Sequence, residues 1–277
     1  MRALLFGTAG IPFSTPGPST INGIRRVKQL GLQCMELEFV QSVNISREKA
    51  PEVKQAALQE DVVLTCHGPY YINLNAKENI KKEQSKHRIV TAATRAWECG
   101  AWSVAFHLGF YLGQEKKAVY KTVKEELQKA MNILRDNSIP ITVRAETTGK
   151  GSQFGDADEL IALSSEVENV LPCIDFAHLH ARSGGKENTY EEFTAVLQSV
   201  EKTLGKEALK NMHIHLAGIA YSEKGERNHL NLQESDMNYK TLAQAWKDFK
   251  IAGTVICESP NIEQDALLLQ REYTKSK

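Results

Sequence analysis

Seven short apolar runs of the sequence each end in, or are followed directly by, a carboxylate or an imidazole. These residues, in chain order, are Glu36, His67, His107, Glu146, Asp175, His215 and Glu258. One such residue alone is usually a structural hydrogen-bonding group or a helix cap. Seven successive cases instead predict that the side chains meet in one place. A mixture of neutral imidazoles and carboxylates suits zinc, manganese or iron.

The segment CIDFAHLHARSGG, residues 173–185, is the densest of these stretches. Asp175 ends an apolar run, and His178 and His180 follow, so the segment is either a polar turn or one corner of a metal site. Both histidines lie just after an expected strand end, where either could bind a metal or make a structural hydrogen bond. Upstream of His215, His213 should point the same way, one layer deeper in the fold.

The cysteines are expected to pack rather than to bind metal, since cysteine is commonly buried. Cys66 and Cys257 directly precede candidate ligands, so on a strand their side chains should face the opposite side, toward helices. Cys173 shares the parity of Asp175 and could face inward below it. None of the five cysteines forms a CxxC pair, which is typical of a reduced, cytoplasmic protein.

Clustered carboxylates repel one another strongly in a buried site unless cations compensate them. The candidate ligands are also too many for one tetrahedral ion. We therefore expect two or three metal ions, which could be zinc, manganese or iron.

Apolar runs alternate with longer amphipathic stretches along the whole chain, which predicts a single (β/α)8 TIM barrel of the α/β class spanning residues 1–277. The expected strands lie near residues 3–7, 34–39, 62–66, 103–107, 141–146, 171–176, 212–216 and 254–258. The expected helices lie near residues 21–30, 46–59, 77–99, 115–136, 156–166, 189–205, 236–249 and 262–274. In such a barrel the active site lies at the C-terminal ends of the strands. The alternative, an open doubly wound sheet, lacks a glycine-rich dinucleotide loop after the first run.

The composition sets limits on partners. Lys+Arg and Asp+Glu both number 34 among 277 residues, so the net charge gives no general attraction to nucleic acid or anionic membranes. The N-terminal stretch MRALLFGTAGIPF is broken by glycine and proline and predicts a first core strand rather than a signal peptide. No apolar run approaches the roughly 20 residues that span a bilayer, so no membrane association is expected. We expect a monomer.

The ordered motifs CHGPYYINL, FHLG, AETTGKGSQFG, CIDFAH, HIHLAG and CESP resemble the endonuclease IV family, the metal-dependent apurinic/apyrimidinic endonucleases of DNA repair. The resemblance runs in order from about residue 60 to 260. It implies a TIM barrel with three metal ions, normally zinc.

Carried over position by position, the resemblance assigns three ligand sets. The first metal would be held by His67, His107 and Glu146. The second would share Glu146 and add Asp175, His215 and Glu258.

The third metal would take His178 together with a carboxylate and a histidine from the loop after the seventh strand. The chain departs from the family there, because the usual Asp-x-His pair is replaced by GERNHLNL. This stretch offers Glu226 and His229 with one extra residue between them, and Asn228 stands at the usual histidine position.

The implied activity is hydrolysis of double-stranded DNA on the 5′ side of an abasic site. Bound metals activate water for this reaction, with Glu146 and Glu258 as the catalytic carboxylates. Tyr70 matches a family tyrosine near the abasic nucleotide. Lys150, Arg182 and Lys186 are the candidate phosphate contacts.

Two other functions remain open. Sugar isomerases and epimerases of the xylose-isomerase-like barrel group use the same ligand set that Glu146, Asp175, His215 and Glu258 would form, and Glu36 in MELEF resembles that group. His67 and His107 favour the endonuclease instead. A non-catalytic metal- or ligand-binding barrel has no feature in the chain that supports it.

Overall fold

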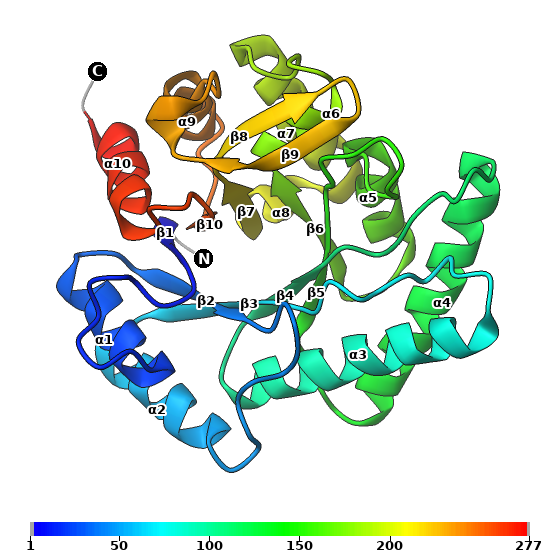
Figure 1. Cartoon of the computed structure of the whole chain (residues 1–277), viewed down its shortest axis with the longest axis horizontal. Coiled ribbons are helices and arrows are strands. Elements are labelled where there is room, and N and C mark those ends of the chain that lie inside the picture. The colour runs from blue at the N-terminus through cyan, green and yellow to red at the C-terminus, as the bar shows by residue number, and fades with distance from the viewer. Residues whose placement is uncertain (1–2, 276–277) are drawn as a thin grey trace.

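A closed barrel of eight parallel strands forms the centre of the molecule in the computed structural model, which describes residues 3–275 (Figure 1). Around the barrel the strand order is β1, β10, β7, β6, β5, β4, β3, β2. The barrel strands are β1 Leu4–Ala9, β2 Cys34–Glu38, β3 Val63–His67, β4 Ser103–Phe106, β5 Thr142–Glu146, β6 Val170–Asp175, β7 Met212–Leu216 and β10 Gly253–Cys257. The predicted (β/α)8 fold is therefore confirmed. The prediction that one domain spans residues 1–277 includes positions 1–2 and 276–277, which lie outside the described residues.

Helices follow the strands and cover the outside of the barrel (Figure 1). The larger ones are α1 Thr20–Gln29, α2 Ala50–Glu60, α3 Asn79–Glu98, α4 Lys116–Asp136, α5 Ala157–Glu166, α7 Tyr190–Leu204, α9 Tyr239–Asp248 and α10 Glu263–Thr274. Each lies within a few residues of its predicted range. Two shorter helices, α6 Phe176–Arg182 and α8 Lys206–Leu209, and one 3-10 turn, η1 Leu232–Glu234, were not predicted.

The strands are apolar on both faces because one face meets the helices and the other fills the barrel. All five residues of β7 are buried, for example, although two of them are histidines. Closure occurs between β1 and β10, where Leu4 pairs with Gly253. On its other side β10 pairs with β7, where Gly253 lies opposite Met212. Gly253 has φ +136°, and a Cβ there would collide with the backbone of Met212, so only glycine allows β10 to approach β7 this closely.

The loop that was expected after the seventh strand is instead an antiparallel hairpin of β8 Gly218–Ser222 and β9 Gly225–Leu230. The hairpin lies outside the barrel and packs beside α6 (Figure 1). Its turn depends on Gly225, which has φ +93°. Polar residues dominate β9, so apolar periodicity did not reveal it. Between residues 3 and 275, no helix is long and apolar enough to cross a membrane.

Candidate metal centre

The candidate ligands converge at the C-terminal ends of the barrel strands, around a pocket of about 290 Å³. Its lining includes His67, His107, Glu146, His178, Glu226, His229 and Glu258. Tyr70 and Lys150, which were predicted to contact substrate, also border this pocket. The ligand residues fall into three groups, and within each group one candidate ligand atom per residue lies within 4.8 Å of the others.

The first group consists of His67, His107 and Glu146. Oε2 of Glu146 lies 3.0 Å from Nε2 of His67 and 3.3 Å from Nε2 of His107. His67 is the last residue of β3, and His107 directly follows β4, so neighbouring strands bring the two rings together. Their ring centroids are 5.6 Å apart.

The second group shares Glu146 and adds Asp175, His215 and Glu258. Nδ1 of His215 lies 3.1 Å from Oε1 of Glu146 and 3.1 Å from Oε1 of Glu258. The two oxygens of Glu146 thus face different groups, which is the arrangement that a bridging carboxylate requires.

The third group consists of His178, Glu226 and His229. Nε2 of His178 lies 3.7 Å from Oε2 of Glu226, and Nε2 of His229 lies 4.0 Å from Oε1 of the same residue. Glu226 and His229 come from β9, so the hairpin carries two members of this group to the barrel mouth. Asn228 is exposed and donates to the backbone oxygen of His229, so it does not belong to the group.

Backbone carbonyls fix the ring orientation of three of these histidines. Nδ1 of His67 lies 2.7 Å from the oxygen of Gly68, Nδ1 of His178 lies 2.9 Å from that of Thr147, and Nδ1 of His229 lies 3.2 Å from that of Glu258. A carbonyl can only accept, so each Nδ1 carries a proton and Nε2 is the nitrogen left to offer its lone pair to a metal. Metal-binding histidines are commonly held in this way.

The buried carboxylates give the centre a negative field that favours the binding of cations. Oε2 of Glu146 and Oδ2 of Asp175 are buried without a hydrogen-bond donor. Burial lowers the pKa of His67, but the carboxylates of Glu146, Glu38 and Glu36 together outweigh it and raise this pKa to about 10. Burial likewise opposes charge on His178, yet Asp175 and Glu146 raise its pKa to about 9. The field of the carboxylates therefore attracts positive charge, and the mixed imidazole and carboxylate donors fit divalent zinc, manganese or iron.

Asp175 is both a helix cap and a candidate metal ligand. It is the N-cap of α6, where Oδ1 accepts from the backbone N–H of His178 at 2.7 Å. Its other oxygen, Oδ2, lies 3.3 Å from Nδ1 of His178. The cap therefore holds the carboxylate and the imidazole in one orientation.

His180 and Arg182 lie outside the pocket lining. His180 bridges the carbonyl of Lys186 and the carboxylate of Asp236, at 2.7 and 3.0 Å, so its role is structural. Nη1 of Arg182 lies 2.9 Å from Oγ1 of Thr148 and also contacts backbone carbonyls of the same loop. These contacts are all made by Nη1 and brace the loop after β5, and the phosphate contact expected of Arg182 stays a prediction.

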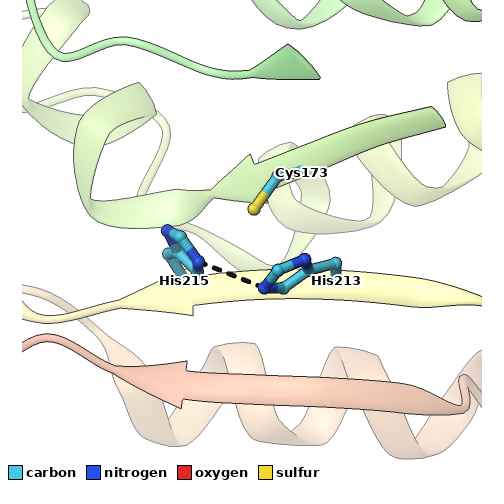
Figure 2. Close-up of side chains that lie close together, drawn as sticks. All are labelled: Cys173, His213 and His215. Carbon is cyan, nitrogen blue, oxygen red and sulfur yellow. Dashed lines mark hydrogen bonds between the residues drawn. The ribbon is translucent and has the colours of Figure 1, made fainter. Parts of the chain in front are cut away.

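A polar layer lies directly beneath the centre, inside the barrel. Glu36 was expected at the end of the second strand, but β2 continues to Glu38, and Glu36 lies one layer deeper. Its Oε2 is 3.0 Å from Nε2 of His213, and its Oε1 is 2.9 Å from Nε2 of His215. Cys173 faces the same space from β6, as its parity predicted (Figure 2). Glu38 was missed as a candidate, although it shares the parity of Glu36.

Comparison with known proteins is consistent with this architecture. A family described as xylose isomerase-like TIM barrel matches residues 24–275, so the chain belongs to this family. An uncharacterized protein of Methanocaldococcus jannaschii is 45% identical over 272 residues, covering 98% of this chain and 97% of that protein. A protein named "Probable endonuclease 4" of Mycoplasma pneumoniae is 25% identical over 184 residues, covering 65% of this chain and 61% of that protein. The resemblance drawn from the motifs is thereby confirmed.

Solved structures share the fold at low identity. A D-tagatose 3-epimerase-like protein has a TM-score of 0.74 and 16% identity, covering 96% of this chain and 94% of that one. Endonuclease IV of Thermus thermophilus has a TM-score of 0.70 and 19% identity, covering 96% of this chain and 97% of that one. The fold therefore leaves both kinds of chemistry open.

Proposed function

We propose that the protein is a metal-dependent phosphodiesterase that cleaves double-stranded DNA on the 5′ side of abasic sites. The observation that carries this proposal is the presence of three ligand groups around one pocket. An isomerase of this family would need only the four-residue group of Glu146, Asp175, His215 and Glu258. His67 with His107, and His178 with Glu226 and His229, go beyond that requirement. Sequence similarity to proteins named endonuclease 4 supports the same function.

Several cations suit phosphodiester hydrolysis because the reaction develops charge on the attacking oxygen, on the phosphate and on the leaving oxygen. Divalent metals in these groups would lower the pKa of a water molecule and offset the negative charge of the phosphate. Zinc fits the donor set, and manganese and iron fit it too. In the hydrolysis the water oxygen bonds to phosphorus, the P–O3′ bond breaks, and the 3′-oxygen leaves as a hydroxyl.

Two carboxylates are placed to act in this step. Glu258 borders the pocket with a side chain that is 13% exposed, and its Oε2 lies 3.9 Å from Nε2 of His229. It can therefore accept a proton from water that enters between the groups. Glu146 is buried and would hold its position as the residue shared by two groups. We assign these two residues the catalytic roles.

Tyr70 and Lys150 are proposed to bind the substrate. Tyr70 is 57% exposed, and its ring contacts His67 edge-on with centroids 5.3 Å apart. An aromatic ring at the mouth can support a nucleotide that has been turned out of the helix. Lys150 lines the same mouth and can neutralise a phosphate.

The test is nicking of a duplex that contains one tetrahydrofuran abasic analogue. Metal-replete protein should cut on the 5′ side of the analogue and leave a 3′-hydroxyl, and prolonged chelation should abolish cutting until metal is restored. A matched duplex without the analogue is the control. Intact duplex after incubation with protein that carries three ions per chain would refute the proposal.

A sugar epimerase or isomerase is the second candidate, favoured by one observation. Glu36 lies beneath the four-residue group, at the position where the sequence resembles the sugar enzymes. Turnover of a ketose by protein that fails to nick would support this function instead. The metal count separates the two independently, since an isomerase needs one or two ions rather than three.

A further inference from the structure

His215 is oriented differently from the other histidines of the metal centre. Its Nδ1, rather than its Nε2, faces the carboxylates, at 3.1 Å from both Glu146 and Glu258. A neutral imidazole carries one proton, so Nε2 must hold that proton if Nδ1 is to offer a lone pair to a metal. Among residues 3–275, no backbone carbonyl accepts a hydrogen bond from this nitrogen. Nε2 instead points into the closed layer beneath the centre.

Two acceptors in that layer compete for the proton. Oε1 of Glu36 lies 2.9 Å from Nε2 of His215. Nε2 of His213 lies 3.2 Å from the same nitrogen (Figure 2). His213 in turn is 3.0 Å from Oε2 of Glu36, and its Nδ1 is 3.1 Å from Oγ of Ser103. Glu36, Ser103, His213 and His215 have no exposed surface, so water cannot satisfy any of them.

One assignment of the protons gives every group of this layer a partner within about 3.1 Å, although the ring N–H groups are not well aligned with the oxygens of Glu36. If His215 donated to His213, the latter would carry its own proton on Nδ1, and Glu36 would receive no hydrogen bond from either ring. A fully buried carboxylate without a donor is costly. If both Nε2 protons are turned toward Glu36, each of its oxygens has a donor within ion-pairing distance, 2.9 Å from His215 and 3.0 Å from His213. The hydroxyl of Ser103 then donates to Nδ1 of His213.

We propose that Glu36 is a positioning residue that holds the Nε2 proton of His215 and thereby commits Nδ1 to the metal of the second group. His213, which is itself hydrogen-bonded to Ser103, contacts the other oxygen of Glu36 from β7. This inference rests on the metal of the proposed function but not on its substrate.

A cation bound in the inner layer would be a different explanation for the buried cluster of Glu36, His213 and His215. Ligand atoms of Cys173, His213 and His215 lie within 4.8 Å of one another, and neither oxygen of Glu36 has a well-aligned donor. However, an ion there would need the Nε2 lone pair of His215 while Nδ1 binds the metal of the second group. The imidazole of His215 would then have to lose both of its N–H protons. A proton that stays on Nε2 and faces Glu36 avoids this.

The first experiment compares Glu36→Gln with wild type in the transfer of metal to a competing chelator. Glutamine keeps the shape but loses the charge and one acceptor. One ion per chain should bind about 10- to 100-fold more weakly, as observed when such partners are removed, and the other ions should be unchanged. Glu263→Gln is the matched control, because Glu263 is also a buried carboxylate but accepts from the backbone N–H groups of Phe13 and Ser14 rather than from a histidine. Equal affinities in Glu36→Gln and wild type would overturn the proposal.

Two measurements keep the proposal testable if Glu36→Gln does not fold. In zinc-loaded wild type, nitrogen NMR should show His215 with a metal-bound Nδ1 and a protonated Nε2; an unprotonated Nε2 would contradict it. In cobalt-substituted protein, Cys173→Ser should leave the spectrum and the metal count unchanged. A thiolate-to-cobalt band that disappears in this variant would mean that the inner layer binds an ion. None of these readouts requires DNA cleavage, so a failure of the proposed function would be recognised separately.

Discussion

At the scale of single residues, the environment of each ring determines the chemistry available to the centre. Three backbone carbonyls direct Nε2 of His67, His178 and His229 toward the ligand groups, and His215 is held in the opposite sense. Such outer partners decide which lone pair is available. Loss of a histidine that itself belongs to a ligand group should therefore reduce metal binding and activity more than loss of the residue that orients it.

His107→Ala is expected to reduce the rate of nicking by more than about 100-fold. This is more than the roughly 10- to 100-fold loss that follows removal of a residue that only orients a metal ligand. His107 lies 3.3 Å from the carboxylate of Glu146 and belongs to the group that an isomerase would not need. His87→Ala is the matched control, because His87 is exposed on α3. Initial rates on the abasic duplex provide the measurement, together with the metal content. Full activity in His107→Ala would remove the first group from the mechanism.

Glu38 gives a pH prediction that is independent of catalysis. Burial, and secondly the charge of Glu36, raise the pKa of Glu38 from 4.5 to about 8. The folded protein therefore keeps this proton over a pH range in which the unfolded chain has lost it, and the free energy of unfolding falls as pH rises from about 4.5 to about 8.

Glu38→Gln removes this titration. In metal-free protein the variant should gain thermal stability over wild type as pH rises from 5 to 8, by an amount on the order of a few °C. Melting curves at the two pH values provide the measurement. A difference between variant and wild type that is the same at both pH values would mean that Glu38 titrates normally.

At the scale of secondary-structure elements, the hairpin of β8 and β9 completes the third group. The backbone N–H of Glu226 donates to the carbonyl of Gly149 at 2.9 Å, which docks the hairpin onto the loop after β5. Gly225 precedes Glu226 with φ +93°, and a Cβ there would collide with the same carbonyl. The docking of Glu226 therefore depends on a glycine.

Gly225→Ala should release the ion of the third group while keeping the barrel folded. The new methyl group must push β9 away from Gly149, and Glu226 and His229 move with it. Gly113→Ala is the control, because Gly113 also has a positive φ, +72°, but nothing lies within 4 Å of its added Cβ. Metal analysis should give one ion fewer for Gly225→Ala only. If both variants lost the same ion, the cause would be backbone strain rather than the collision of the new methyl group with Gly149.

The barrel and most of the centre could be predicted from sequence because parallel strands bring their C-terminal ends to one edge. Parity also predicted that His213 and Cys173 lie below the ligands. The pairing of Glu36 with His213 could not be predicted, since β2 and β7 are not neighbours and meet only across the closed barrel. The hairpin was missed for a different reason: its backbone pairing and Gly225, rather than an apolar pattern, hold β9 in place.

At the scale of the whole molecule, the metal centre joins strands from around the barrel. Members of the three groups come from β3, β5, β6, β7, α6 and the hairpin, or directly follow β4 and β10. These segments are far apart in sequence, and the unfolded chain cannot present them together. Cations should therefore bind the folded state far better than the unfolded chain, and binding should stabilise the fold.

Removal of metal should accordingly lower the melting temperature. A ligand at 100 times its dissociation constant adds about 2.7 kcal/mol to the free energy of unfolding. For a chain of this size each kcal/mol corresponds to roughly 2–4 °C, so restoring zinc to chelated protein should raise Tm by roughly 5–10 °C. His67→Ala should show a smaller rise, because one ligand of the first group is gone. Since the groups are rich in buried carboxylates that repel one another, a Tm that zinc leaves unchanged would mean that protons alone compensate these charges.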